Sequence, residues 1–253
     1  MTVKVDPENN EIRALFDLAD LDGRDVLEIG AGDTRLTRRY AGRVRRVAAV
    51  EPFAPAIARA RETMPGELAS RVELHPVAFE EFAAATESSS FDTAILSWSL
   101  CCMNPEIMVP ALEEIHRLLR TGGTLVDIHP VPEVSLIEVF RRGQVVFAKP
   151  EPNSDTQEAR HADDALRQVA ERDLFVLEDA TKFDFRIYAA SVGELRDFSA
   201  EANAHEGDTG DQVQDASESE FYEQVEDMMA AAGEGAEVAF YEKGRIARLR
   251  PVR

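Results

Sequence analysis

A strand, glycine turn, helix and strand between Val26 and Glu51 constrain the fold more than any other stretch of this chain. An apolar run ends at Gly30 and Gly32, a polar segment that favours a helix begins near Asp33, and a second apolar run ends in the carboxylate of Glu51. Glycine has no Cβ, so the backbone there can pass close to a ligand. The start of the following helix would direct backbone N–H groups at the same space.

The spacing within this stretch indicates a nucleoside site. Glu51 comes 51 − 30 = 21 residues after Gly30, close to the roughly 20 residues that separate a glycine turn from a ribose-binding acid. The third glycine of the dinucleotide fingerprint is absent, because Arg35 stands in its place, and this disfavours NAD and FAD. The alternative is that the glycines serve only a tight turn.

The charge of the chain limits its partners. Its 253 residues are enough for one large domain or two small ones, and a hydrophobic content of 44% is enough for a substantial core. The chain carries 48 acidic and 28 basic side chains. The resulting net charge of −20 repels phosphate backbones and acidic membrane surfaces. We therefore expect no nucleic acid and no membrane partner, whereas a neutral or cationic small molecule meets no barrier. The same charge could equally serve solubility alone.

The cysteines and the chain start favour a soluble, cytoplasmic protein, and we expect it to be a monomer or homodimer. The two cysteines, Cys101 and Cys102, are adjacent and imply no disulfide framework. No apolar signal core opens the chain, and no apolar run reaches the roughly 18 residues that a membrane helix needs. The five histidines show no metal-ligand spacing.

Five short apolar runs alternate with helical patterns in the first half of the chain, which predicts a parallel sheet covered by helices on both faces. A first helix is expected to begin at Asp6-Pro7-Glu8, and the third strand to leave through a loop at 76–79. A helix that opens at Asn104-Pro105 is expected to restart at Pro110. The expected strands are 26–29, 47–50, 72–75, 93–97 and 124–128.

The pattern changes after Pro130. Two β-prone segments, 135–140 and 144–148, flank Arg141-Arg142-Gly143 and predict a hairpin. The polar, acidic segment 202–219 is expected to be a mobile loop. The remaining expected elements are a loop at 149–154, helices at 155–171, from Ser191 and at 220–232, and strands at 174–188 and 237–249.

Four segments occur in an order that resembles the class I S-adenosylmethionine (SAM)-dependent methyltransferases. They read VLEIGAGD from Val26, VEP from Val50, FDTAILSWSL from Phe91 and EIHRLLRTGGTL from Glu114. The resemblance covers about 23–130, half of the chain. It implies an α/β, Rossmann-like, doubly wound sheet of seven mostly parallel strands with an antiparallel last strand, helices on both faces and a β-hairpin inserted after the fifth strand.

The resemblance also implies roles for residues around the glycine turn. Glu28 matches the acid near the methionine ammonium, although a helix-capping or lysine-pairing role is the alternative. Gly30, Ala31 and Gly32 match the turn that passes beneath the cofactor. Glu51 matches the acid that accepts both ribose hydroxyls.

The adenine contacts come from two later loops. By the resemblance, Phe53, which follows Pro52, would lie against the adenine, and Val77, Ala78 and Phe79 would frame its edge. Many family members have an acid where Val77 stands. Here the hydrogen bond to the adenine amine would come from elsewhere, from the backbone or from Glu80.

Residues at the ends of the fourth and fifth strands would face the reacting methyl group. Ser97 and Trp98 match positions beside the methionine arm, and the alternative for Trp98 is a place in the core. His129 ends the fifth strand at the ligand-binding edge. It is a weak candidate for a base or a substrate contact, and no general base is otherwise evident.

These observations predict a single domain over 1–253. Its parts would be an N-terminal cap helix (1–22), a SAM-binding core (23–130), a hairpin or lid (131–154) that walls the acceptor site, and a C-terminal half that completes the sheet (155–253). The expected activity is methyl transfer from SAM to a small molecule by in-line displacement. A non-catalytic SAM-fold binding or regulatory protein and, less favoured, an NAD-dependent oxidoreductase are the alternatives.

Overall fold

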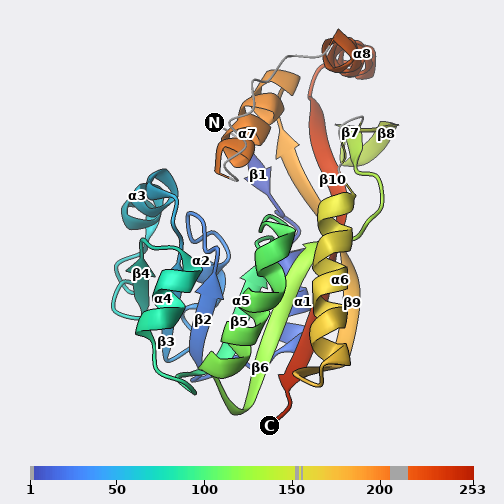
Figure 1. Cartoon of the computed structure of the whole chain (residues 1–253). Coiled ribbons are helices and arrows are strands. Elements are labelled where there is room, and N and C mark those ends of the chain that lie inside the picture. Colours follow the sequence, from blue (N-terminus) through green and yellow to red (C-terminus); the bar gives the residue numbers. More distant parts are fainter. Residues whose placement is uncertain (1–2, 152–153, 155, 206–215) are drawn as a thin grey trace. The chain divides into compact units, whose positions relative to one another are not determined.

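The computed structural model describes residues 3–151, 154, 156–205 and 216–253. The described chain forms two compact units (Figure 1). The core unit comprises Ile12–Val131, Gln157–Phe183 and Gly244–Arg253, and the antiparallel unit comprises Met1–Glu11, Pro132–Thr156 and Asp184–Lys243. Two long strands, β9 and β10, contribute one part to each unit. The single-domain organisation stays a prediction.

The core unit contains the expected, mostly parallel sheet. Its strand order is β4-β3-β2-β5-β6-β10-β9. Strands β2 to β6 pair in parallel, and β10 pairs antiparallel with β6, so the fold-class prediction is confirmed. All five residues of β2 are buried, as expected for a parallel strand covered on both faces. The bounds are β2 Asp25–Ile29, β3 Arg46–Val50, β4 Val72–His75, β5 Phe91–Ser97, β6 Leu119–Pro130, β9 Phe175–Ala189 and β10 Ala236–Pro251.

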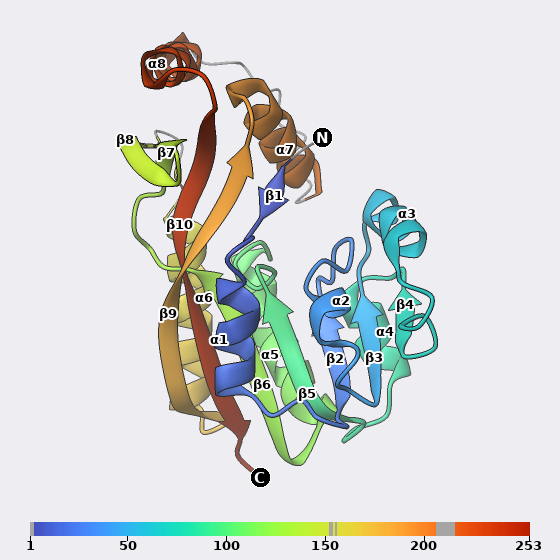
Figure 2. The ribbon, with the colours of Figure 1, turned by 180° about the vertical axis from the view of Figure 1, so that it is seen from behind.

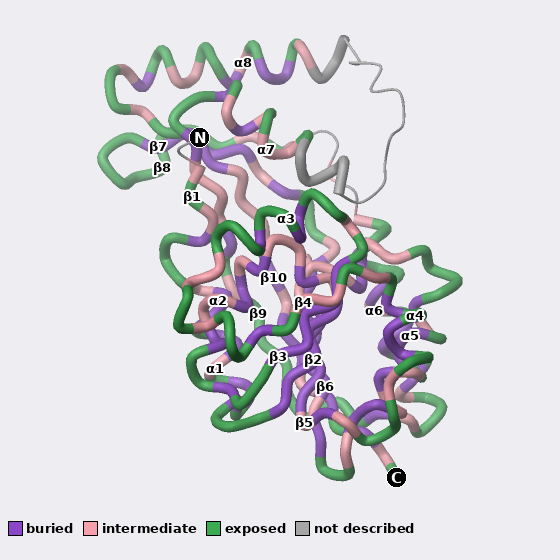
Figure 3. Tube along the Cα trace, turned by 90° about the vertical axis from the view of Figure 1, so that its left-hand side faces the viewer, coloured by how far each residue is buried: buried purple, intermediate pink, exposed green. Residues whose placement is uncertain are grey.

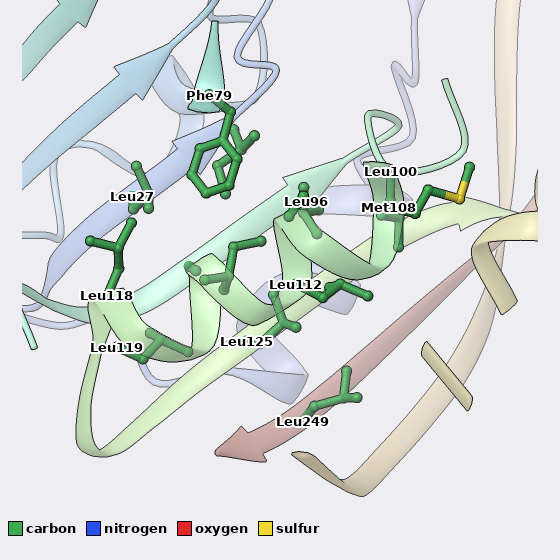
Figure 4. Packing of buried hydrophobic residues seen from close by; sticks show 14 of the residues in the cluster. Leu27, Phe79, Leu96, Leu100, Met108, Leu112, Leu118, Leu119, Leu125 and Leu249 are labelled. Atoms are coloured by element: carbon green, nitrogen blue, oxygen red, sulfur yellow. The ribbon is translucent and has the colours of Figure 1, made fainter. Parts of the chain in front are cut away.

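Helices cover both faces of this sheet, and alternate strand residues build two separate cores. On one face, Leu27 and Leu96 pack with α4, α5 and α6 (Figure 4). On the other face, Val26 and Ile95 pack with α1 and α2. Figure 2 shows α1 on the face opposite to α5, and Figure 3 shows buried backbone concentrated in the central strands. The bounds are α1 Asn10–Leu18, α2 Thr37–Tyr40, α3 Ala54–Thr63, α4 Phe79–Ala85, α5 Pro105–Leu118 and α6 Gln157–Glu171.

The antiparallel unit surrounds a third core built on the predicted hairpin. Arg142 and Gly143 both have positive φ, 52° and 76°, the conformation that two-residue hairpin turns favour because it matches the twist of the strands. The hairpin also pairs through β7 with β10, which the sequence did not predict. The unit contains β1 Lys4–Val5, β7 Leu136–Arg141, β8 Gln144–Pro150, α7 Val192–His205 and α8 Ala216–Ala232, with parts of β9 and β10.

Three helix predictions need correction. The helix after the glycine turn begins at Thr37, because Thr34 adopts a left-handed φ of 66° and delays the first helical turn. Helix α5 runs without a break through Pro110. Because Pro110 has no N–H, the carbonyl of Glu106 lacks its helical donor, and on this exposed side of the helix water can donate to that carbonyl instead. Helix α4, which starts at Phe79, occupies a segment for which no helix was predicted.

The predicted starts and loops also shift. Asp6 does not begin a helix; its carboxylate accepts from the backbone N–H groups of Asn10 and Glu11 at 2.9 and 3.0 Å and caps α1 from upstream. Of the predicted mobile loop at 202–219, both ends are helical, in α7 and α8. Its middle, 206–215, lies outside the described residues.

Candidate functional site

The glycine turn lies at the edge where the carboxyl ends of β2, β3 and β5 meet. Gly30 and Gly32 both have positive φ, 70° and 56°, which side chains with a Cβ rarely adopt. The N–H groups of Gly30 and Ala31 donate to the carbonyl of Val50 at 2.9 and 3.1 Å. The turn is therefore fixed to the end of β3, one residue before the predicted ribose-binding acid.

Glu51 is held between two backbone segments. Its side chain is 2% exposed; Oε2 accepts from the N–H of Gly32 at 2.9 Å and Oε1 from the N–H of Phe53 at 2.8 Å. Each carboxylate oxygen can accept more than one hydrogen bond, and these two bonds fix the orientation of the group. The structure thus brings together the turn and the acid that the spacing predicted, with exposed Pro52 and half-buried Phe53 next to them.

Glu28 is anchored by two hydroxyl groups from α2. The Thr37 hydroxyl and the Tyr40 hydroxyl donate to the same carboxylate oxygen, Oε2, at 2.5 and 2.6 Å. Burial, and then the negative charge of Glu28, raise the pKa of Tyr40 well above its usual value of 10. Two hydroxyl donors therefore fix the Glu28 carboxylate. Sequence reasoning missed Thr37 and Tyr40, whose only signal was their place in the helical segment after the turn.

The loop after β5 closes against the glycine turn. Trp98 and Ser97 are half-buried there; Trp98 has a φ of 56°, and its N–H donates to the carbonyl of Ile128 at 2.7 Å. The Ser99 hydroxyl donates to the carbonyl of Ile29 at 2.7 Å. A Cβ added to Gly30 would lie 2.4 Å from the Cβ of Ser99. Gly30 is thus required by close packing as well as by its φ, a contact that the sequence did not reveal.

The predicted adenine loop divides between core and surface. Val77 is half-buried and Ala78 is exposed. Phe79 is 6% exposed and points into the core with Leu27 and Leu96 (Figure 4). The Phe79 side chain therefore packs the sheet, and only its backbone is placed to meet a ligand. The adenine contacts stay a prediction.

His129 lies in a charged network at the carboxyl end of β6. Its Nδ1 is 2.5 Å from a carboxylate oxygen of Asp127, and its Nε2 is 3.3 Å from Asp163, which is also 3.3 Å from a guanidinium nitrogen of Arg245. Burial alone would lower the pKa of His129, but the charges and hydrogen bonds of Asp127 and Asp163 raise it to about 10. A protonated imidazole cannot accept a proton, so this geometry disfavours His129 as a general base.

The His129 network predicts a loss of stability in mild alkali. The folded pKa of about 10 lies above the ordinary value of 6.5, so the stabilisation is complete below pH 6.5 and is lost as the pH rises towards 10. The groups that act on the network are Asp127, Asp163, Arg245 and Lys182. We expect the free energy of unfolding, measured in urea, to fall between pH 6.5 and 9.5 more steeply for the wild type than for His129→Asn. Parallel curves would contradict this assignment.

None of the described His, Cys, Asp and Glu side chains gather in groups of three or more that could hold a metal ion. Among the described helices, none is both long and apolar enough to cross a membrane.

Known proteins resemble this chain in the sequence of its first half and in its fold. The model of a family described as "Methyltransferase domain" matches residues 26–123, and no curated protein sequence matches the chain at a significant level. A provisionally assigned methyltransferase from Bacillus halodurans C-125 is 13% identical, with a TM-score of 0.58 over 95% of this chain and 98% of that one. The N-methyltransferase NodS from Bradyrhizobium japonicum WM9, solved with S-adenosylhomocysteine, is 14% identical, with a TM-score of 0.50 over 90% and 78%.

A third structure, the cyclase SpnF, is 16% identical, with a TM-score of 0.54 over 96% of this chain and 80% of that one. At such identities the likeness shows the fold, and a fold hosts more than one activity. The family match covers the glycine turn, the buried acid at 51 and the loop after β5. Residues 26–123 are therefore similar to a methyltransferase domain, and the chain shares its fold with these solved structures.

Proposed function

We propose that this protein transfers a methyl group from SAM to a small-molecule acceptor. The observation that carries the proposal is the carboxylate of Glu51, which the N–H groups of Gly32 and Phe53 orient at the carboxyl edge of β3. Ligands of open α/β sheets bind at this edge. A carboxylate held there in one orientation suits the vicinal hydroxyls of a ribose, because both of its oxygens can accept.

The residues around the turn fit the rest of the cofactor. Gly32 has no Cβ, so an adenosine can approach the backbone closely at that end of the turn. Glu28, held by Thr37 and Tyr40, would carry the charge that meets an ammonium group. When bound, SAM supplies an activated methyl group on a sulfonium that leaves as a neutral thioether. The role of the protein is then to align the acceptor and to exclude water, which alone can contribute several kcal/mol.

The acceptor is proposed to be neutral or cationic. The support is electrostatic: 48 acidic against 28 basic side chains disfavour the approach of a polyanion such as RNA or DNA. The charge on His129 leaves catalysis without that base, which favours an acceptor that needs no deprotonation in the transition state, such as an amine that is neutral at working pH. Alignment is then the main source of rate acceleration.

Calorimetry tests the cofactor part of this proposal. SAM and S-adenosylhomocysteine should bind with one site per chain, whereas NAD should not bind. Methyl transfer from labelled SAM to a panel of small amines, phenols and thiols, with RNA as the negative arm, then tests the acceptor class. Because SpnF has this fold and is named a cyclase, binding of SAM without transfer to any acceptor would favour a role other than methyl transfer.

A further inference from the structure

The two cysteines form a preorganised pair in the loop that follows β5. Cys101 and Cys102 are the only cysteines of the chain, and neither forms a disulfide. Their sulfur atoms lie 3.8 Å apart. Cys101 is buried at 5% exposure, whereas Cys102 is half-buried and is the member that a reagent reaches first.

This separation suits a bridging atom better than a direct bond between the sulfurs. Adjacent Cα atoms are about 3.8 Å apart across a trans peptide, whereas disulfides usually need about 4.4 Å or more. An atom that bonds each sulfur at about 2.3 Å, the length known for zinc thiolates, would span 3.8 Å at an angle near tetrahedral. The pair can therefore close on one thiophilic atom with little movement.

The surroundings indicate which thiophilic atom fits. Metal ions such as zinc usually require three or four protein ligands, and the described His, Cys, Asp and Glu side chains supply no such group. A trivalent arsenical needs only two sulfurs, because it brings its own third substituent. We propose that Cys101 and Cys102 form a dithiol site for trivalent arsenicals, and that occupying it weakens cofactor binding.

The capture is balanced without an oxidant. Two As–S bonds form when an organoarsenic oxide meets the two thiols. The two thiol protons leave with the oxygen of the arsenical as one molecule of water, and arsenic stays trivalent. Neutral thiols suffice for this condensation, so it does not depend on a lowered cysteine pKa.

The loop geometry connects this pair to the glycine turn. The thiol of Cys102 donates to the carbonyl of Trp98 at 3.1 Å, and Trp98 holds a left-handed φ of 56°. Between them, Ser99 bonds the carbonyl of Ile29 and packs against Gly30. Capture removes the Cys102 proton and with it the hydrogen bond to Trp98. The loop then loses a bond that fixes its own conformation, next to the turn on which the proposed SAM site rests.

Phenylarsine oxide is the probe for the capture itself. Intact-mass spectrometry should show one phenylarsenic group per wild-type chain, removed by 2,3-dimercaptopropanol but retained in glutathione. Cys101→Ser and Cys102→Ser each keep one thiol and should lose the adduct in glutathione. An adduct of equal resistance in the single variants, or none in the wild type, would overturn the site. This arm requires no SAM and stands even if the proposed function fails.

Calorimetry with SAM tests the coupling, which rests on the proposed function. The adduct should lower the affinity of the wild type about tenfold, within the usual range of coupling between sites, and dimercaptopropanol should restore it. The unmodified wild type must bind SAM. If it does not, the proposed function is wrong, but the mass-spectrometric evidence for arsenical capture is not affected. Equal affinity with and without the adduct would overturn the coupling.

Discussion

Glu51→Ala is expected to weaken SAM binding by about 1–3 kcal/mol, the usual cost of removing a charged hydrogen-bonding partner, or roughly 5- to 150-fold in Kd. The side chain has two functions that alanine cannot replace. It would accept from the ribose hydroxyls, and it holds the N–H groups of Gly32 and Phe53 in register. Calorimetric titration of the folded variant with SAM and S-adenosylhomocysteine measures the loss.

A second buried carboxylate provides the matched control. Asp25, at the opposite end of β2, is 1% exposed and lies in ion pairs with Arg45, Arg46 and Arg120. Burial would raise the pKa of Asp25, but the hydrogen bonds from these arginines hold it well below its usual range. Asp25→Ala should therefore reduce stability and leave the SAM affinity of the folded protein unchanged. If Glu51→Ala bound SAM like the wild type, the ribose-binding role would be wrong.

The parallel core could be predicted from sequence because its determinants are local. Strands such as Val26–Ile29 and Val47–Val50 are apolar because both sheet faces are covered. Glycines mark the turn between them, and the acid at 51 follows at a fixed distance. Each of these signals lies within a few residues of the element it specifies, so no tertiary contact was needed to find them.

The remaining features depend on contacts between distant residues. The hydroxyls of Thr37 and Tyr40 reach Glu28 only because α2 packs beside β2. The pairing of β7 with β10 joins segments about a hundred residues apart. His129 acquires its partner Asp163 from α6, and Asp163 in turn pairs with Arg245 of β10. Secondary-structure propensity and residue spacing do not identify such tertiary partners. The network that raises the pKa of His129 therefore could not be predicted from the sequence.

Gly30→Ala is expected to destabilise the protein by about 2–4 kcal/mol. The positive φ of 70° costs an alanine about 1 kcal/mol. The new Cβ would also lie 2.4 Å from the Cβ of Ser99, and overpacking of this kind typically costs about 1–3 kcal/mol. Neither side can move easily, because the Gly30 N–H bonds Val50 and the Ser99 hydroxyl bonds Ile29. Urea denaturation measures the loss, and SAM affinity should fall with the displaced turn.

Gly23 separates the two contributions to this cost. It has nearly the same φ, 69°, but an added Cβ would meet nothing within 4 Å, so Gly23→Ala should lose only the conformational part, about 1 kcal/mol. In a double-mutant cycle, Ser99→Gly removes the Cβ that clashes and should recover most of the difference between the two alanine variants. Ser99→Gly alone loses the bond to Ile29, a cost that the cycle subtracts. Equal losses for Gly30→Ala and Gly23→Ala would show that the loop after β5 can move away from the turn. The proposed coupling of the cysteine pair to the cofactor edge depends on this close packing, and it would then have no mechanical basis.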